Sequence, residues 1–213
     1  MSKEYHKIQS VYFRDPSNNH KTFLDGQWAQ PEFGLLKDLT WVGTEKVDGT
    51  NIRIIWDGEN VRFAGKTDRA DLPSVLVEYL HAHFTPERML EGTKGPVTLY
   101  GEGYGGKIQK GSRYRPDQRF ILFDVWADAE PLGVWLSREI VEEVAFCLDI
   151  PVVPVVYEGP LEEAIGIVAG GFTSNVAETE IIAEGLVLRP QHELRDRMGR
   201  RIITKVKHSD FPR

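Results

Sequence analysis

Apolar and polar residues alternate on both sides of a short polar segment around Lys46, which is the pattern of half-buried strands. After this segment the apolar residues stand at every second position, namely Ile52, Ile54 and Trp56. A second alternating run covers residues 61–63, and the turn-forming residues 57–60 separate the two runs. We therefore expect a β-hairpin within residues 41–65, with Lys46 in the loop at its entrance.

The rest of the chain holds a mixture of helical and strand patterns. Apolar residues at helical spacing predict helices over residues 74–90 with a break at Pro86, 137–148 and 161–169. Apolar runs predict strands over residues 97–100, 119–126, 150–157, 184–189 and 202–207. Residues 1–40 have little periodicity and are expected to form short strands and loops.

Composition bounds the class of protein. With 213 residues, of which 41% are hydrophobic, the chain is expected to form a single domain over residues 1–213, or one domain with a small helical lobe. It has no signal peptide and no apolar run long enough to cross a membrane, so we expect a cytoplasmic protein without a membrane partner. The single Cys147 cannot form an internal disulfide, and its place on the apolar face of a predicted helix indicates a small core residue.

The net charge of −6 is distributed unevenly. Residues 104–119 contain five basic side chains and one acid, and residues 189–213 contain eight basic side chains and three acids. Residues 120–184 carry thirteen acids and a single arginine. The basic segments are candidates for contacts with phosphate groups, although such runs also occur on ordinary solvated surfaces.

Several polar side chains stand where a nucleotide would need them. Lys46 lies beside acids and a glycine, and we interpret it as a nucleophile. Lys205 and Lys207 are two residues apart on a strand, so both project from one face, and an anion between them would offset their repulsion. Glu102 lies among glycines and can accept hydrogen bonds from ribose hydroxyls, whereas Phe123 is either a ring that stacks on a purine or ordinary core.

These segments, in this order, resemble the motifs of the covalent nucleotidyltransferases, the polynucleotide ligases and RNA-capping enzymes. The resemblance runs from about Thr44 to Lys207 and is strongest to the phage RNA ligase 2 type. In that type the first motif ends in asparagine, here Asn51, whereas DNA ligases and capping enzymes usually carry arginine. The resemblance implies an α+β nucleotidyltransferase fold, in which helices flank antiparallel sheets. The six residues after Lys207 leave no room for the additional C-terminal domain of many ligases, so we expect the catalytic domain alone.

The resemblance also implies roles for individual residues. The catalytic residues would be Lys46, Lys205, Lys207 and Glu184. The nucleotide would be bound by Glu45, Lys46, Arg69, Glu102, Phe123, Lys205 and Lys207, with Lys66 as an alternative to Arg69. RNA would be bound by Asn51, Lys107, Lys110, Arg113 and Arg115, and a hydrated Mg²⁺ or Mn²⁺ by Glu184 and Asp48.

The function that follows is ATP-dependent RNA ligation in the repair of RNA. Lys46 would attack the α-phosphate of ATP, AMP would pass from the lysine to an RNA 5′-phosphate, and an RNA 3′-hydroxyl would displace it. Like-charge repulsion from Lys205 and Lys207 would favour the neutral, nucleophilic form of Lys46. Two alternatives stay open: an ATP-dependent DNA ligase, against which Asn51 argues, and a nucleic-acid binding module with an inactive nucleotide site. No obligate protein partner is evident.

Overall fold

The computed structural model describes residues 4–128 and 132–211, and this part of the chain forms two compact units. The first unit combines the N-terminal residues up to His6 with residues 48–153. The second combines residues 7–47 with residues 154–211. The polypeptide therefore passes from one unit to the other directly after Val47, so that Lys46 belongs to the second unit and Asn51 to the first.

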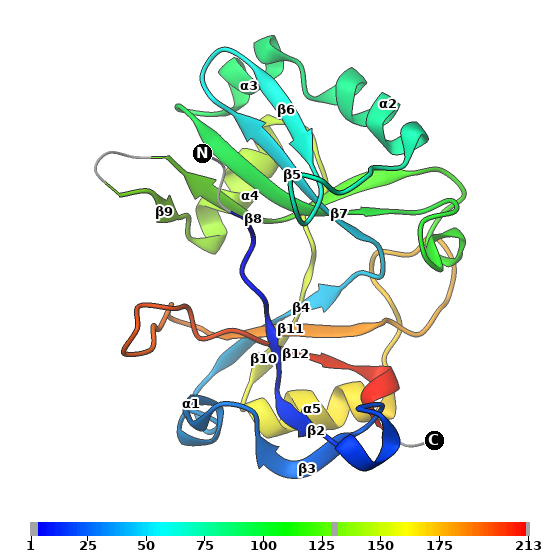
Figure 1. The fold of residues 1–213 in the computed structure, drawn as a ribbon, viewed down its shortest axis with the longest axis vertical. Helices are drawn as coiled ribbons and strands as arrows, with labels where there is room; N and C mark the ends of the chain where they lie inside the picture. Colours follow the sequence, from blue (N-terminus) through cyan, green and yellow to red (C-terminus); the bar gives the residue numbers. More distant parts are fainter. Residues whose placement is uncertain (1–3, 129–131, 212–213) are drawn as a thin grey trace. The chain divides into compact units, whose positions relative to one another are not determined.

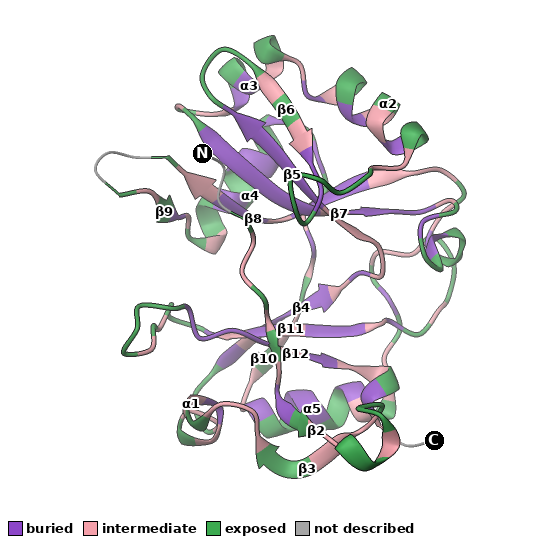
Figure 2. Cartoon of the chain, viewed as in Figure 1, coloured by how far each residue is buried: buried purple, intermediate pink, exposed green. Residues whose placement is uncertain are grey.

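The first unit is built on an antiparallel sheet of five strands in the order β6-β5-β7-β8-β9 (Figure 1). The strands are β5 (Thr50–Trp56), β6 (Val61–Ala64), β7 (Val97–Tyr104), β8 (Arg119–Ala127) and β9 (Val134–Trp135). β5 and β7 are buried along most of their length (Figure 2). The predicted hairpin is the pair β5 and β6, which residues 57–60 connect.

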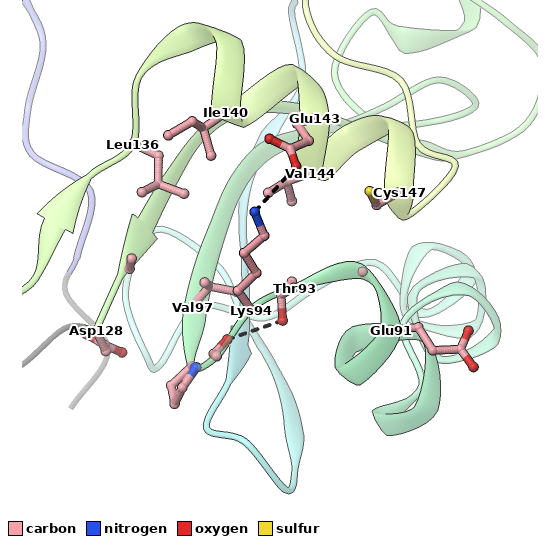
Figure 3. Close-up of a pocket in the computed structure, with 14 residues that line it drawn as sticks. Glu91, Thr93, Lys94, Val97, Asp128, Leu136, Ile140, Glu143, Val144 and Cys147 are labelled. Atoms are coloured by element: carbon pink, nitrogen blue, oxygen red, sulfur yellow. Dashed lines mark hydrogen bonds and ion pairs between the residues drawn. The ribbon is translucent and has the colours of Figure 1, made fainter.

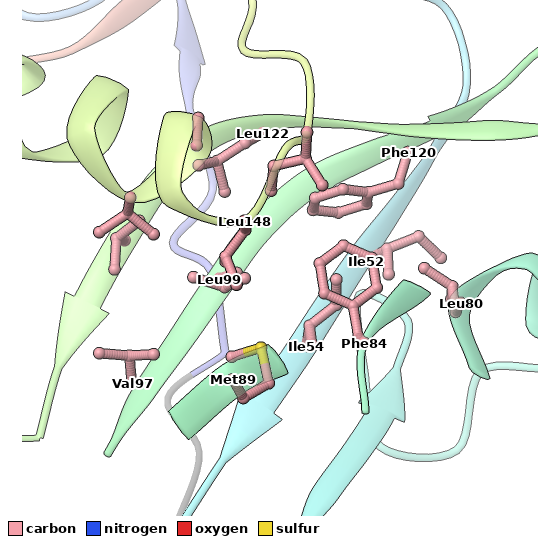
Figure 4. Close-up of a cluster of buried hydrophobic side chains, with 14 of the residues drawn as sticks. Ile52, Ile54, Leu80, Phe84, Met89, Val97, Leu99, Phe120, Leu122 and Leu148 are labelled. Atoms are coloured by element: carbon pink, nitrogen blue, oxygen red, sulfur yellow. The ribbon is translucent and has the colours of Figure 1, made fainter. Parts of the chain in front are cut away.

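Three helices cover one face of this sheet: α2 (Ser74–His83), α3 (Pro86–Gly92) and α4 (Arg138–Cys147). Their apolar side chains pack on those of the strands in one cluster, part of which Figure 4 shows, including Ile52, Leu80, Met89, Leu99 and Leu148. Each fully buried side chain of this size stabilises the fold by about 1.5–3 kcal/mol. The predicted break at Pro86 is confirmed, because this proline is the first residue of α3.

The second unit contains another five-stranded sheet, in the order β1-β12-β11-β4-β10. Its strands are β1 (Gln9–Ser10), β4 (Trp41–Lys46), β10 (Val155–Gly159), β11 (Gly185–Pro190) and β12 (Thr204–Lys207). β1 runs parallel to β12, and the other pairs are antiparallel. Helix α5 (Leu161–Gly170) packs with Trp41, Leu186, Leu188 and Val206 of the sheet in a second apolar cluster.

Smaller elements complete the two units. The second unit holds helix α1 (Pro31–Leu35), the strand pair β2 (Tyr12–Arg14) and β3 (Phe23–Trp28), and the 3-10 helices η1 (Pro16–Asn18) and η3 (His208–Asp210). The first unit holds the 3-10 helix η2 (Gly111–Arg113). In the part of the chain that the structure describes, no helix is both long and apolar enough to cross a membrane.

The structure corrects three details of the sequence prediction. β4 pairs with β10 and β11 rather than with β5, so Lys46 ends a strand of the other sheet and does not enter the hairpin. β7 continues through Glu102 to Tyr104, because the glycines on either side of Glu102 pair regularly with β5. Cys147 is exposed rather than part of the core.

Candidate active site

Predicted site residues of the second unit gather where three neighbouring strands begin or end. Lys46 is the last residue of β4, and it pairs with Gly185 of β11, which in turn pairs with Lys207 of β12. Glu184 stands immediately before Gly185, between the two lysines. Its Oε2 lies 2.7 Å from Lys46 Nζ and its Oε1 lies 2.6 Å from Lys207 Nζ, so one carboxylate forms ion pairs with both ammonium groups.

The central position of this row requires glycine. Gly185 has a φ of +156°, and a Cβ atom at this position would collide with the Val206 carbonyl oxygen of the neighbouring strand. With glycine in place, β11 pairs closely with both flanking strands, and no side chain of its own stands between Lys46 and Lys207.

Lys205 completes the group of lysines. It stands two residues before Lys207, and both are half-buried while Thr204 and Val206 are buried, as expected when alternate residues share a face. Burial lowers the pKa of the Lys205 ammonium, and the charges of Lys46, Lys207 and Arg14 lower it further, against the opposing effect of Glu184. Three ammonium groups near one carboxylate leave excess positive charge, which suits a phosphate group.

Asp210 fixes the end of β12, and the sequence pattern gave no signal for this role. Its Oδ2 accepts a hydrogen bond from the Lys207 backbone N–H at 3.0 Å, and its Oδ1 lies 2.6 Å from the Arg14 guanidinium. Asp210 itself is buried, whereas the Arg14 and Lys207 side chains are partly exposed. We infer that the backbone of Lys207 is positioned by this contact.

Glu45, a predicted nucleotide ligand, lies on the opposite face of β4 from Lys46, since neighbouring residues of a strand alternate. Its carboxylate is buried and accepts hydrogen bonds from the Ser174 hydroxyl and, at 2.7 Å, from the Asn175 backbone N–H. Burial raises the pKa of the Glu45 carboxyl, although these hydrogen bonds oppose the shift. The structure thus brings Glu45 together with Ser174, which sequence analysis missed.

In the first unit, two predicted ligands lie side by side. Asn51 of β5 pairs directly with Glu102 of β7, so their side chains are cross-strand neighbours on the sheet face away from the helices. The Oδ1 atom of Asn51 is buried and has no hydrogen-bond partner among the described residues. A buried amide oxygen without a donor is costly unless a ligand supplies one.

Gly49 explains how the chain approaches this pair. A Cβ atom at Gly49 would collide with the Gly103 carbonyl oxygen and crowd the Glu102 side chain. The glycine therefore lets the segment after Lys46 pack against β7, directly beside Glu102.

Phe123 lies at an irregularity of β8. The pairing of β7 with β8 shifts between Tyr100, which faces Asp124, and Gly101, which faces Leu122, so Phe123 is the extra residue of a β-bulge. Phe123 is half-buried, and the Tyr5 ring stands edge-on to it at 5.1 Å. The Tyr5 hydroxyl donates a hydrogen bond of 2.9 Å to Asp124 Oδ2, an N-terminal contact that sequence analysis did not foresee.

Arg69 and Lys66 are both exposed in the loop after β6. This loop is held by Arg53, a fully buried residue of β5 that sequence analysis missed. Arg53 donates hydrogen bonds to the Gly65 carbonyl oxygen at 2.8 Å and to Asp68 Oδ1 at 2.6 Å. Asn51 and Arg53 are polar residues two positions apart in an apolar strand, and this spacing could have indicated from the sequence that Arg53 has a specific role.

The basic segment predicted to bind RNA is the connection from β7 to β8. Lys107, Lys110 and Arg113 are exposed, and Arg115 is half-buried and paired with Asp117 at 2.6 Å. The connection reaches Asp48 through the Tyr114 hydroxyl, which accepts a hydrogen bond of 3.1 Å from the Asp48 backbone N–H. Lys107, Lys110 and Arg113 thus lie at the surface, where contact with RNA would require them.

The carboxylates of the described residues do not outline a metal site, and one apolar hollow stands apart from the predicted site residues. The described residues contain no group of three or more His, Cys, Asp or Glu side chains that could hold a metal ion. A hollow of about 510 Å³ opens between α3, α4 and β7, and its sides include Leu136, Ile140 and Val144 (Figure 3). None of the predicted site residues lines this hollow.

The chain was compared with protein families, curated proteins and solved structures. Residues 39–207 match the family model described as RNA ligase. A comparison with curated proteins gave no match. Among solved structures, Naegleria gruberi RNA ligase with PPi is 18% identical with a TM-score of 0.65, and the match covers 97% of this chain and 56% of that one. Variants of the same ligase with ATP and Mn (17% identical) and with AMP and Mn (16% identical) give the same TM-score and coverage.

The chain thus spans a little over half the length of these ligases. At such identities the similarity shows the fold, and the predicted α+β fold of the nucleotidyltransferase type is confirmed.

Proposed function

Because the chain belongs to the RNA ligase family, we propose that it is an ATP-dependent RNA ligase that works through a lysyl-AMP intermediate. The observation that carries this proposal is the row Lys46, Gly185 and Lys207, with the Glu184 carboxylate bonded to both ammonium groups. Naegleria gruberi RNA ligase, a structural neighbour, has been solved with ATP and Mn. The proposed partners are ATP and RNA ends that carry a 5′-phosphate and a 3′-hydroxyl.

In the first step, Lys46 Nζ forms a bond to the α-phosphorus of ATP while the bond from that phosphorus to the bridging oxygen breaks, which releases pyrophosphate. The attacking nitrogen must first lose a proton, and Glu184 Oε2, at 2.7 Å, is placed to hold it. Lys205 and Lys207 then stabilise the negative charge that grows on the phosphate oxygens. Glu102 and Phe123 of the first unit are assigned to the ribose and the adenine ring.

In the second step an RNA 5′-phosphate oxygen displaces Lys46 from the AMP phosphorus, and in the third an RNA 3′-hydroxyl displaces AMP. Asn51 is assigned to the RNA phosphate, to which its Nδ2 amide can donate, whereas its buried Oδ1 is an acceptor without a partner among the described residues and would take a hydrogen bond from a ribose hydroxyl. The exposed cations Lys107, Lys110 and Arg113 are assigned to the RNA strand, and Arg69 to the nucleotide.

A divalent ion, Mg²⁺ or Mn²⁺, fits this chemistry only as a largely hydrated ion. Glu184 is the carboxylate of the lysine cluster, and both of its oxygens are paired with ammonium groups, so direct ligands from the protein are few. Once Lys46 carries AMP it is no longer cationic, and Glu184 would then be able to hold the hydrated ion. Asp48 is assigned to the same ion, which would supply charge neutralisation at the phosphates.

The experiment that tests the function is a sealing assay with ATP and two otherwise identical substrates. One carries ribonucleotides at the 3′-hydroxyl end and the other is DNA throughout. We expect faster sealing of the ribonucleotide end, because the 2′-hydroxyl is the group that distinguishes the two polymers. Equal rates on both substrates would contradict the assignment to RNA, and absence of sealing on either would contradict ligation.

Replacement of Asn51 should separate the steps. Asn51→Ala is expected to leave lysyl-AMP formation nearly intact and to slow the joining of a pre-adenylated RNA strand about ten-fold, or about 1.4 kcal/mol of lost transition-state stabilisation. The pre-adenylated strand bypasses the first two steps, so the measurement isolates the last. A normal joining rate would remove Asn51 from the RNA phosphate and weaken the preference for RNA over DNA.

A further inference from the structure

A second hollow in the first unit has the chemistry of a nucleotide site but contains none of the residues assigned to ATP. It measures about 550 Å³ and lies between α2 and the connection from β7 to β8. This volume falls within the range of about 300–1,000 Å³ typical of sites for small organic groups. Helix α2, which lines the hollow, packs on the sheet face that bears Ile52 and Leu99, whereas Asn51 and Glu102 lie on the opposite face.

Aromatic and cationic groups are already aligned at this hollow. The rings of Tyr79 and His83, one turn apart on α2, are stacked with centroids 4.0 Å apart and an angle of 29°. His83 Nδ1 lies 2.8 Å from the Tyr79 carbonyl oxygen, which fixes the imidazole ring. The Arg119 guanidinium lies 5.0 Å from the centre of the Tyr79 ring, and Lys107 is exposed at the same hollow. Flat rings next to cations are the groups that bind bases and phosphates of single-stranded RNA.

One polar atom at the hollow is buried without a hydrogen-bond partner among the described residues. It is the side-chain Oε1 atom of Gln118, a residue that lines the hollow. Such an atom costs free energy unless a donor reaches it, and the exocyclic amino group of a nucleobase is a suitable donor.

The acids at this hollow do not cancel its attraction for phosphate. Glu78 and Asp117 line it, but Asp117 is already paired at 2.6 Å with Arg115 and at 2.6 Å with Arg119. The exposed cations Lys110 and Arg113 stand on the same connection. The four charged residues that line the hollow, Glu78, Asp117, Lys107 and Arg119, sum to zero, so the excess positive charge beside it comes from Lys110, Arg113 and Arg115 of the connection.

We propose that this hollow is a subsite for one unpaired nucleotide of the RNA substrate, separate from the residues assigned to ATP. The base lies against the stacked rings of Tyr79 and His83 and donates to Gln118 Oε1, while its phosphate meets Lys107 and Arg119. This inference rests on the proposed function, because it assumes that the polymer bound is RNA.

The test compares His83→Ala and Gln118→Leu with the unaltered protein. The matched control is His81→Ala, which lies on the same helix but contacts Phe63 and does not line the hollow. The binding of a short single-stranded oligoribonucleotide is measured by fluorescence anisotropy, and lysyl-AMP formation and the midpoint of thermal unfolding are measured in parallel. We expect His83→Ala and Gln118→Leu each to weaken RNA binding five- to ten-fold, while both variants keep normal lysyl-AMP formation and a normal unfolding midpoint. His81→Ala should match the unaltered protein in all three measurements.

Equal RNA affinity for the unaltered protein, His83→Ala and Gln118→Leu would overturn the subsite while leaving the proposed ligase standing. A parallel loss of lysyl-AMP formation would also overturn it, because the hollow would then serve the ATP step. If the unaltered protein forms no lysyl-AMP but binds RNA and loses affinity in both variants, the subsite stands and the proposed function fails. Absence of RNA binding by the unaltered protein would overturn the subsite directly.

Discussion

Lys46→Ala is expected to abolish the acid-stable label that the protein takes up from ATP labelled on its α-phosphate. A phosphorus–nitrogen bond to a lysine can form only at a side chain with a free amine, and alanine supplies none. The Lys46 side chain is 20% exposed and is held by Glu184, so its replacement removes the nucleophile without emptying an apolar core. The measurement is a denaturing gel after incubation with labelled ATP and Mg²⁺ or Mn²⁺.

The control is Lys37→Ala. Lys37 is also a partly exposed lysine paired with a glutamate, Glu162, at 3.1 Å, but it lies outside the lysine cluster. The Lys37→Ala variant should take up label from ATP as the unaltered protein does. Full labelling of Lys46→Ala would show that another residue is the nucleophile and would refute the lysyl-AMP mechanism as assigned.

The sequence predicted most elements because their signals are local. Alternation identified β5 and β6, and helical spacing identified α4 and α5. The shared face of Lys205 and Lys207 also followed from strand geometry alone, and the structure agrees with it.

What the sequence did not predict depends on contacts between distant segments. β4 is next to β5 in the chain, yet it pairs with β10 and β11, more than a hundred residues later. The place of Glu184 between Lys46 and Lys207 depends on that same pairing. Likewise, the partners of Glu45 are Ser174 and Asn175, and no periodicity relates residues 129 or 130 positions apart.

The bulge at Phe123 is a further case, because it changes which residues of β8 face the helices. Leu122 and Val125 both belong to the apolar cluster although they are three positions apart. An uninterrupted strand would have placed them on opposite faces. The half-buried position of Phe123 therefore depends on a β-bulge that the sequence pattern of the strand does not predict.

Lys205→Ala is expected to slow lysyl-AMP formation about 100-fold or more, in line with the loss of one preorganised group that stabilises charge in a transition state, about 2.7 kcal/mol or more. At the same time, the midpoint of thermal unfolding should stay the same or rise. Burial and the charges of Lys46, Lys207 and Arg14 all lower the pKa of Lys205, so the folded protein disfavours its charged form near neutral pH. Removal of the ammonium group relieves that unfavourable contribution.

The two readouts together separate a role in the reaction from a role in the fold. Lys94→Ala, which removes an exposed lysine of the first unit, is the control and should leave both the rate and the midpoint unchanged. If Lys205→Ala labels at the normal rate, Lys205 does not contact the α-phosphate. If its midpoint falls in parallel with its rate, Lys205 supports the fold instead, and the charge that stabilises the phosphate must come from Lys207 and the metal ion alone.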